Sequence, residues 1–565
     1  MIRFLAGVAR VFLSLVLGFA AFVIRSAVHH PVAVLAPLVL LVAVVLFWRR
    51  VLGRAAQARH RTRALRWRAR LRLRPGSGYA SLPELWLRWG RVAALSHGRR
   101  ARPGLSLRRR LRSRTTDYAW RLGRAQYFRR CYARLEDQTV VLAPQRTGKS
   151  GLIADRILSH VGPVLATSTR PDLYRLTGTS RAMSGPADVW NPQGIEGVPS
   201  TFGWDILAPC ADLVMARRIA GWLASAVLGG DLGNIEFFKA KGDVALGCLL
   251  WAAAVSRRTI TDVFNWTQLF GHEQALEVLG SHPDSSPQML AVVKRTFADN
   301  RTAGSIRDTI ELALAWAVIP ELAAAVTPAP GHGFDVGRFL DLDSTLYLIA
   351  SGDENSPLTP LFTAFASYVH YAAGLAGSNA PRGRLDPPLL MALDEVTTIC
   401  PVALPVMLSD SAGKGVLIMP VAHSLSQLAE RWGEHGAETI WATCGTKILL
   451  GGSADADMLE EVSRLCGSAS VGEGDGTARV VPAEFLRALP DWRALVLRMN
   501  LSPVVVKIRP AWKRRGLGRL NRRMATLVLP GRHDDDLPDL DEVAVPDAMA
   551  PARLPSRLAG IGGDR

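Results

Sequence analysis

The sequence predicts an α/β fold with a mostly parallel sheet, interrupted by an all-α domain and preceded by two N-terminal transmembrane helices. Three observations predict it: two long apolar runs open the chain, short β-rich runs alternate with helical ones from residue 136, and the stretch 209–335 is almost purely helical. With 565 residues and a hydrophobic content of 48%, the chain is too long and too apolar for a small module or a disordered tail.

The first 50 residues are predicted to form a membrane anchor. Residues 31–48 contain no charge, and at about 1.5 Å per residue this run crosses roughly 27 Å of hydrocarbon. The earlier run, at about 4–24, includes Arg10, which lies close enough to its start to reach the near interface. A cleavable signal peptide is the alternative, but no small-residue cleavage site followed by polar sequence precedes the second run.

Arginines dominate the next segment, 51–135, which is predicted as a cytoplasmic juxtamembrane region. Residues 49–74 hold eleven arginines and no acid, and the positive-inside rule places such a flank in the cytoplasm. We therefore expect a multi-pass protein of the cell membrane with most of its chain in the cytoplasm. The arginines also attract anionic membrane lipids, and contact with DNA phosphates is a possible second use.

Charge and cysteine usage narrow the class of protein further. Residues 1–137 carry 29 Lys and Arg against 4 Asp and Glu, so the formal net charge of +19 belongs to this quarter and the rest is slightly acidic. The six cysteines lie far apart without a C-x-x-C pair, which argues against a zinc site and against a disulfide-stapled secreted domain. A reducing compartment fits this pattern.

The predicted nucleotide-binding core is split into 136–208 and 336–510 by the helical insertion, and 511–565 is a basic, then acidic, Pro/Gly-rich tail predicted to be disordered. Apolar runs in the insertion are short or interrupted by polar residues, so they indicate buried helices rather than further spans. The strand candidates are Thr139 to Ala143, Pro163 to Thr167, Ser344 to Ala350, Leu389 to Leu393, Gly415 to Met419 and Lys447 to Gly451.

A phosphate-binding loop follows the first core strand. The pattern G-x-x-x-x-G-K-[ST] is met except at its first position, where alanine replaces glycine, and a helical sequence follows. In such a loop, backbone N–H groups and the helix N-terminus hold the phosphates of ATP, Lys149 reaches the β- and γ-phosphates, and Ser150 holds Mg²⁺. The alanine is tolerable if its φ stays negative. The predicted cofactor-binding residues are Ala143, Pro144, Gln145, Arg146, Thr147, Gly148, Lys149 and Ser150.

Two adjacent carboxylates end the apolar strand 389–393 in the form of a Walker B element. Asp394 is predicted to bind Mg²⁺ and Glu395 to polarise the attacking water, so both join Lys149 as candidate catalytic or metal-binding residues. The alternative is a buried strand that ends in a solvated acidic turn. A further strand leads into His423 and Gln427, either of which is placed to sense the γ-phosphate, although a core or capping role fits His423 equally well.

The ordered set of APQRTGKS, LLMALDE, HSLSQLAERWG and ILLGGSADADMLEEVSRLCG, after two predicted spans, resembles the conjugative coupling proteins of type IV secretion. The resemblance is to the TraG/TraD class with its TraM-recognition region, in particular its actinobacterial branch, and covers roughly residues 130–505. It implies a RecA/FtsK-like P-loop ATPase that assembles as a homo-hexamer. It also implies DNA, relaxase or relaxosome proteins and secretion-channel components as partners.

Departures from the family pattern concern sensing and coupling between subunits. The stretch 167–172, TSTRPD, stands where many relatives have D-x-K-G-E, and His423 stands where they often have glutamine. The second glutamine of that motif survives as Gln427, which the resemblance makes the preferred catalytic sensor. Arg146 and Arg170 are candidate arginine fingers.

The expected function is that of a membrane-anchored ATPase that moves DNA, or a DNA–protein complex, toward a secretion channel. An FtsK-like double-stranded DNA pump in partition is an alternative, but it predicts a compact C-terminal DNA-reading module of which the tail gives no sign. A non-hydrolysing membrane scaffold is a second alternative, against which the intact Walker residues argue.

Overall fold

The computed structural model describes residues 78–514 and 517, except 126–128, 228–231, 269–270, 299, 354–355 and 471–476. The predicted spans, the arginine segment 49–74 and nearly all of the predicted tail lie outside these residues. No helix within the described ranges combines the length and the apolar character that crossing a membrane requires. The fold below is that of the compact unit that ends at Arg514.

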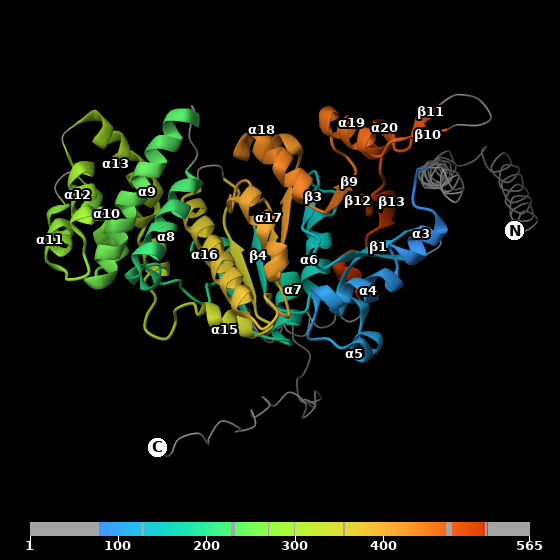
Figure 1. The fold of residues 1–565 in the computed structure, drawn as a ribbon, viewed down its shortest axis with the longest axis horizontal. Helices are drawn as coiled ribbons and strands as arrows, with labels where there is room; N and C mark the ends of the chain where they lie inside the picture. The colour runs from blue at the N-terminus through green and yellow to red at the C-terminus, as the bar shows by residue number, and fades with distance from the viewer. Residues whose placement is uncertain are drawn as a thin grey trace, which may run out of the picture. The chain divides into compact units, whose positions relative to one another are not determined.

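An eleven-stranded sheet forms the centre of this unit (Figure 1). Its strand order is β2-β1-β13-β12-β9-β3-β8-β7-β4-β6-β5. The seven strands from β9 to β5 pair in parallel, whereas β12, β13, β1 and β2 extend the sheet with antiparallel pairs. The strands are β1 (Ala119–Arg124), β2 (Arg130–Arg134), β3 (Thr139–Leu142), β4 (Val164–Ser168), β5 (Ala187–Trp190), β6 (Thr345–Ile349), β7 (Leu389–Leu393), β8 (Val416–Ala422), β9 (Thr446–Leu450), β12 (Arg493–Arg498) and β13 (Leu501–Lys507).

All six strand candidates from the sequence are present, as β3, β4, β6, β7, β8 and β9, with ends shifted by a few residues. The antiparallel extension was not predicted from the sequence. In particular, 119–134 falls within the predicted juxtamembrane region, yet it forms β1 and β2 of the central sheet. Five arginines between 119 and 134 led this segment to be assigned to the basic juxtamembrane region, although a strand can accommodate them on the side that points away from the core.

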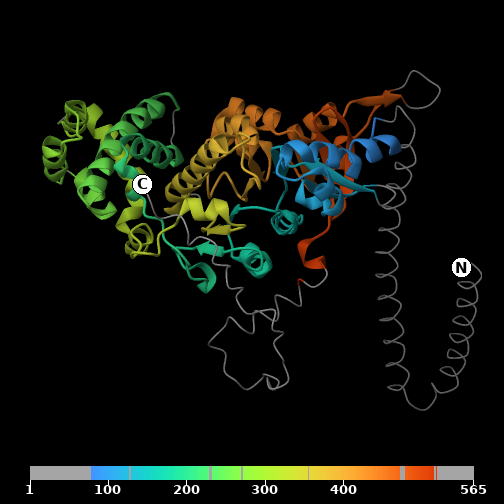
Figure 2. The ribbon, with the colours of Figure 1, turned by 60° about the horizontal axis from the view of Figure 1, so that its bottom comes forward.

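Helices cover both faces of the parallel strands, as a doubly buried sheet requires (Figure 2). Successive residues of β7 alternate between two apolar clusters: Leu389, Met391 and Leu393 belong to one, and Leu390 and Ala392 to the other. The first cluster includes α16 (Leu358–Asn379), α17 (Leu404–Lys414) and α18 (Leu425–Thr443), and the second includes α6 (Lys149–Ser159) and α7 (Asp172–Ala182).

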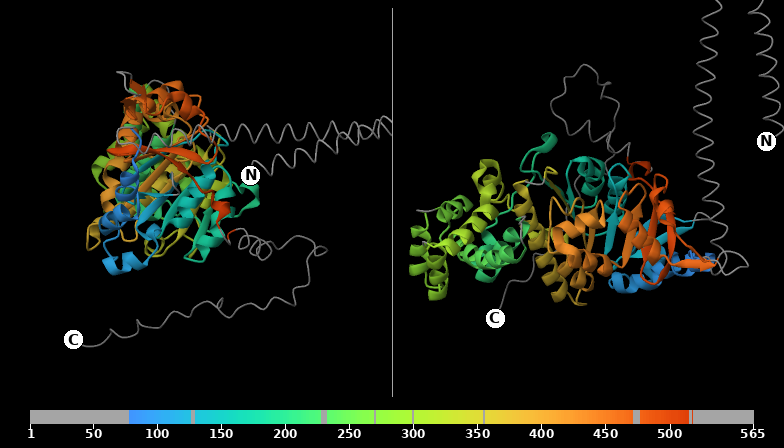
Figure 3. Two further views of the ribbon diagram at one scale, coloured as in Figure 1. Left: turned by 90° about the vertical axis from the view of Figure 1, so that its right-hand side faces the viewer. Right: turned by 90° about the horizontal axis from the view of Figure 1, so that it is seen from above.

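The segment between β5 and β6 is helical in its described part, apart from one isolated bridge between Gly203 and Gly333. Figure 3 shows these helices beside α16, on the side away from the strands. Arg431 of α18 donates hydrogen bonds to the carbonyls of Ser225 and Ala226, at 3.1 and 3.0 Å, which ties the insertion to the core. The helices are α8 (Leu213–Ala226), α9 (Leu232–Val255), α10 (Ile260–Thr267), α11 (Glu273–Ser281), α12 (Pro287–Thr296), α13 (Arg301–Leu314), α14 (Pro320–Ala325) and α15 (Val336–Asp341).

Shorter elements complete the fold near the antiparallel strands. Within the described residues three α-helices precede β1 and two follow β9, and the small antiparallel pair of β10 and β11 lies between those two. They are α3 (Leu82–Leu87), α4 (Arg91–Ala101), α5 (Leu107–Arg112), α19 (Ala456–Leu465), β10 (Ser468–Ser470), β11 (Thr477–Arg479) and α20 (Ala483–Arg487).

Asp155 of α6 holds the antiparallel extension against the helix that follows the phosphate-binding loop. Its carboxylate lies 3.3 Å from Arg121 of β1 and 2.8 Å from Arg514, and only 5% of the residue is exposed. We expect Asp155→Ala to lower the free energy of unfolding by about 2 kcal/mol, because two partly buried guanidinium groups lose a charged acceptor. The thermal unfolding midpoint of the purified full chain would fall by a few degrees.

Asp410→Ala is the matched control, since Asp410 pairs with Lys414 on an exposed helix surface where such pairs contribute little. Equal midpoints for the two variants would contradict the structural role of Asp155.

Candidate active site

The loop 143–148 joins β3 to α6 in the strand, loop and helix order that a phosphate-binding loop requires. The Ala143 N–H donates to the carbonyl of Ala422 on β8 at 3.0 Å, and the Thr147 hydroxyl donates to the carbonyl of Pro144 at 2.7 Å. Ala143 is not among the described residues with positive φ, so alanine fits the first position of the motif. The requirement for a negative φ at Ala143, which the sequence pattern implied, is met.

Gly148 begins the turn into α6 with a φ of 100°, a conformation that L side chains rarely adopt. It caps the helix without a side-chain hydrogen bond, which leaves the first backbone N–H groups of α6 directed toward the position of a phosphate. Lys149 and Ser150 occupy the first turn, while Gln145 and Arg146 are exposed on the loop. Arg146 also has positive φ, at 62°.

The two carboxylates lie directly beside Lys149, although 245 residues separate them from it in the sequence. The ammonium Nζ of Lys149 is 3.1 Å from Oδ1 of Asp394 and forms a closer ion pair with Oε1 of Glu395. The exposed fractions of the three side chains are 11%, 7% and 15%. Parallel strands end at the same edge of a sheet, so β3 and β7 bring the loop and the acids together.

Backbone contacts fix the orientation of the acidic pair. The Thr167 hydroxyl at the end of β4 donates to the carbonyl of Asp394 at 2.7 Å, and the Glu395 N–H donates to Oδ1 of Asp394 at 3.1 Å. Glu395 has a φ of 48°, which turns the chain sharply after β7. Thr167, the first residue of the stretch 167–172 that departs from the family pattern, therefore helps to hold the backbone of Asp394 in place.

His423 contacts the carboxylate that is predicted to act on water. Its Nε2 lies 3.1 Å from Oε2 of Glu395, and its Nδ1 lies 3.1 Å from the carbonyl of Ala143. Gln427 instead uses Oε1 to accept the His423 N–H at 3.0 Å, in the first turn of α18, whose N-cap is Ser424. Of the two candidate sensors, the structure places His423 on the acid and Gln427 in a capping contact with the backbone.

The pKa directions follow from this arrangement. Burial would raise the pKa of Glu395, but the hydrogen bond from His423 and the charge of Lys149 lower it to about 2. Burial would lower the pKa of Lys149, yet the two carboxylates raise it. The pKa of Asp394 is raised, chiefly by burial, and that of His423 is raised, chiefly by its hydrogen bond to Glu395. Lys149 and Glu395 therefore stay charged near neutral pH.

The oxygen donors suit Mg²⁺, which prefers hard ligands and commonly combines one or two protein groups with substrate phosphates. Asp394 contributes a carboxylate at the strand end and Ser150 an exposed hydroxyl residue at the start of α6. The residues that would hold the nucleotide and the metal thus belong to one edge of the sheet.

Two tryptophans that the sequence analysis missed cover the start of α6. A Cβ on Gly148 would lie 2.8 Å from the ring of Trp492, and one on Gly151 would lie 2.9 Å from Trp512. The two rings contact each other edge to face, with centroids 5.0 Å apart. They follow the loop by more than 340 residues and belong to no motif, so nothing in the sequence pointed to them.

Arg170, a candidate arginine finger, is 66% exposed and pairs with Glu196, with Nε 3.3 Å from Oε1, and more distantly with Asp172 at 3.8 Å. Arg146, the other candidate, is exposed on the loop itself. Both lie where another subunit could reach them, and whether either acts as a finger stays a prediction.

The His423–Glu395 contact predicts a pH-dependent stability in the absence of nucleotide. Because folding raises the pKa of His423, the pair stabilises the folded state fully below pH 6.5, the ordinary histidine pKa, and this contribution is lost as the pH rises through the raised value. We expect the thermal midpoint of the full chain to exceed that of His423→Gln below pH 6.5, with a difference that shrinks toward pH 9.

His435→Gln serves as the control, since the side chain of His435 is fully exposed. A difference between the full chain and His423→Gln that stays constant from pH 5 to pH 9 would contradict the charged pair.

A known protein family matches the part of the chain that contains the acidic strand and His423. The family described as the TraM recognition site of TraD and TraG matches residues 388–479, a range that includes Asp394, Glu395 and His423. No curated protein sequence matches the chain. The resemblance predicted from the motifs is therefore confirmed by a match that starts at the acidic strand.

Solved structures share the fold. The plasmid coupling protein TrwB, in complex with the non-hydrolysable GTP analogue GDPNP, is 20% identical over 66% of this chain and 86% of its own, with a TM-score of 0.53. An unbound form of the conjugative coupling protein TrwBdeltaN70 is 19% identical over 66% and 85%, with a TM-score of 0.53. TrwB with ADP and Mg²⁺ is 20% identical over 66% and 86%, with a TM-score of 0.51. Residues 388–479 thus resemble the TraM recognition site of TraD and TraG, and they lie on a fold that TrwB shares.

Proposed function

We propose that the protein is a membrane-anchored ATPase that acts as a conjugative coupling protein and delivers DNA, or a DNA–protein complex, to a type IV secretion channel. The observation that carries this proposal is the meeting of Lys149 with Asp394 and Glu395 at one sheet edge, within a fold that TrwB shares. The match to the TraM recognition site, which begins just before β7, supports the function of a conjugative coupling protein over that of another ATPase with the same fold.

In this proposal ATP binds with its phosphates at the N-terminus of α6. Lys149 leaves the two carboxylates for the β- and γ-phosphates, so the ion pairs seen here hold the lysine in place until the substrate arrives. Ser150 and Asp394 would hold Mg²⁺, which when bound neutralises charge on the phosphate oxygens. Once released from Lys149, Glu395 can accept a proton from the attacking water.

His423 connects Glu395 to the N-terminus of α18 and so links ATP hydrolysis to the position of that helix. One ring nitrogen contacts Glu395, the other lies at the carbonyl of Ala143, and the next residue caps α18. A change at the γ-phosphate that moves Glu395 would therefore also move His423 and the N-terminal turn of α18. Gln427 keeps its predicted role as a sensor only if substrate binding draws its side chain away from the His423 backbone.

The partners extend the same proposal. Because the matched family is described as a TraM recognition site, residues 388–479 are proposed to bind a TraM-like relaxosome protein. The inserted helices are proposed to engage a relaxase or other cargo, and the two N-terminal spans to anchor a homo-hexamer beside the channel. DNA contacts are proposed to be made largely to phosphates, which makes transport independent of sequence.

Transfer of DNA between cells tests the function. In the natural host, Lys149→Ala is expected to lower transfer of the mobile element to the background of a strain lacking the protein, while Lys414→Ala, at an exposed lysine, transfers normally. Normal transfer with a partition defect in Lys149→Ala would favour the FtsK-like alternative. Normal transfer and normal partition would favour a scaffold that does not hydrolyse ATP.

A further inference from the structure

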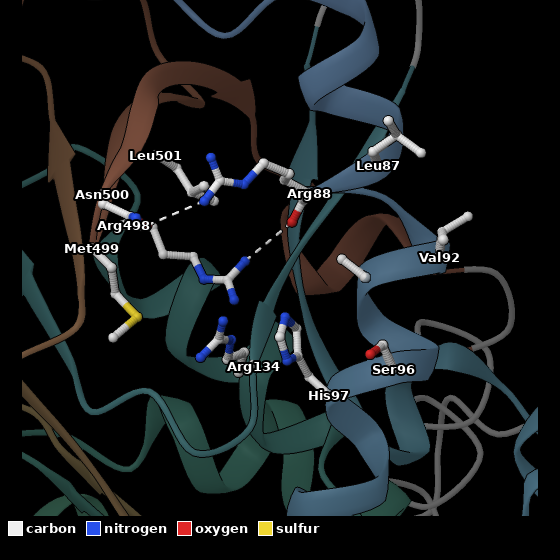
Figure 4. A pocket seen from close by; sticks show the side chains of 11 residues that line it. Leu87, Arg88, Val92, Ser96, His97, Arg134, Arg498, Met499, Asn500 and Leu501 are labelled. Atoms are coloured by element: carbon white, nitrogen blue, oxygen red, sulfur yellow. Dashed lines mark hydrogen bonds between the residues drawn. The ribbon is translucent and has the colours of Figure 1, made fainter.

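A polar cavity lies between α3, α4, the end of β2 and the turn that joins β12 to β13 (Figure 4). It is near the start of β3, whereas the phosphate-binding loop follows the end of that strand. Its volume is about 210 Å³. Three arginines and one histidine line it, with no carboxylate among the lining residues: Arg88, Arg134, Arg498 and His97. A cavity of this size is below the roughly 300–1,000 Å³ typical of drug-sized ligands, which favours a compact anionic group over a nucleotide.

The charges of this cavity are only partly compensated. Arg498 is buried and forms an ion pair with Asp137, in which Nε of Arg498 lies 2.8 Å from Oδ2 of Asp137. Arg88 reaches only the amide oxygen of Asn500, at 3.3 Å, and within the described ranges neither Arg88 nor Arg134 forms an ion pair. The buried Nε of Arg134 lacks a hydrogen-bond partner in the same part of the chain. Two guanidinium groups thus remain without an anion.

The pKa of His97, which also lines the cavity, is lowered by burial and partly by the same positive charges. Burial lowers the pKa of His97, and the charges of Arg134 and Arg498 lower it further, against a smaller opposite effect of Asp137. The buried Nε of Arg134 is costly without an acceptor, and an oxyanion would remove this cost and also pair with the exposed guanidinium of Arg88.

Apolar side chains at the rim indicate what carries the oxyanion. Leu87, Val92 and Met499 line the cavity yet are 50%, 47% and 65% exposed, and Trp86 beside them is 55% exposed. Exposed Trp and Leu next to arginine are typical of surfaces that lie at a membrane interface. The position in the chain agrees, because α3 begins 34 residues after the end of the second predicted span.

We propose that this cavity binds the phosphate of an anionic phospholipid headgroup, with Arg88 and Arg134 on the phosphate oxygens and Leu87, Val92 and Met499 against the acyl region. The inference rests on the membrane anchoring proposed above. Bound in this way, a lipid would fix the antiparallel end of the sheet against the bilayer and so set the direction in which the unit faces.

Hydrogen–deuterium exchange of the full chain in lipid nanodiscs tests the proposal. Peptides covering 82–101 and 498–501 are expected to exchange more slowly in discs that contain phosphatidylglycerol than in discs of phosphatidylcholine alone. In the double variant Arg88→Gln/Arg134→Gln, this protection should require about 30-fold more anionic lipid, because each arginine contributes to lipid binding. Arg99→Gln, which changes an exposed arginine of α4 that does not line the cavity, should behave as the unchanged chain does.

The other results separate the possible failures. Equal protection by soluble glycerol phosphate would mean a small phosphate ligand and would overturn the lipid assignment. Protection that is the same in both kinds of disc would mean that the cavity does not select an anionic lipid and is covered by a zwitterionic lipid or a protein contact, and it would overturn the assignment as well. A chain that enters the discs without lipid-dependent protection refutes the cavity alone, whereas a chain that does not enter them refutes the anchor on which the proposal rests.

Discussion

Replacement of Glu395 by glutamine is expected to lower the kcat of ATP hydrolysis by about 10²–10⁴-fold, the range that a positioned general base contributes. The amide keeps the shape of the side chain and its contact with His423 but cannot accept the proton of the attacking water. Binding of ATP should persist or tighten, because Lys149 is then held away from the phosphates by Asp394 alone. Steady-state kinetics together with a direct binding measurement separate the two effects.

The control for this experiment is Glu438→Gln, which changes a carboxylate that is 76% exposed on α18. It should leave both kcat and ATP affinity unchanged. Wild-type turnover in Glu395→Gln would remove Glu395 from the chemistry and leave it only as the partner that holds Lys149.

Lys149→Ala should have the larger effect on binding. Loss of the ammonium removes charge-assisted hydrogen bonds to the phosphates, at about 1.5–3 kcal/mol each, so ATP affinity is expected to fall at least tenfold and hydrolysis to become undetectable. The substitution also leaves the buried Asp394 beside the partly buried Glu395, with His423 as the remaining basic partner of the pair among the described ion pairs. The thermal midpoint without nucleotide should therefore fall too.

Lys414→Ala removes an exposed lysine of the same kind and should alter neither binding nor stability by much. Full ATPase activity in purified Lys149→Ala protein would contradict the assignment of the phosphate-binding loop.

The central part of the site was predictable from sequence because its chemistry depends on short motifs. Lys149 follows a strand and opens a helix, and Asp394 and Glu395 end another strand, so parallel pairing alone brings them to one edge. The helical segment between β5 and β6 was predictable from its 3.6-residue periodicity, and it accounts for most of the 245 residues that separate the two motifs.

Other features depend on tertiary packing that no local pattern encodes. The arginine-rich strands β1 and β2 join the sheet because Trp120, Leu122 and Cys131 are buried on it, while the arginines point elsewhere or pair with Asp155. Arginines interrupt the apolar residues of 119–134 without a regular alternation, so the strand signal was too weak for this to be predicted.

The relative roles of His423 and Gln427 illustrate a second limit. Family resemblance favoured Gln427, but in this chain the first turn of α18 uses that side chain to accept the backbone N–H of His423. The imidazole then lies between Ala143 and Glu395, where its two ring nitrogens each meet an oxygen. Which side chain caps a helix and which faces a ligand depends on distances of a few tenths of an ångström, which spacing in a sequence cannot specify.

The rate of ATP hydrolysis by the purified full chain, measured with Mg²⁺ in the presence and absence of DNA, tests the central claim most directly. The account predicts hydrolysis that DNA stimulates, that Lys149→Ala and Glu395→Gln abolish, and that Lys414→Ala retains. Hydrolysis that survives both active-site substitutions, or an unchanged protein that binds ATP but never hydrolyses it with any DNA, would contradict the account.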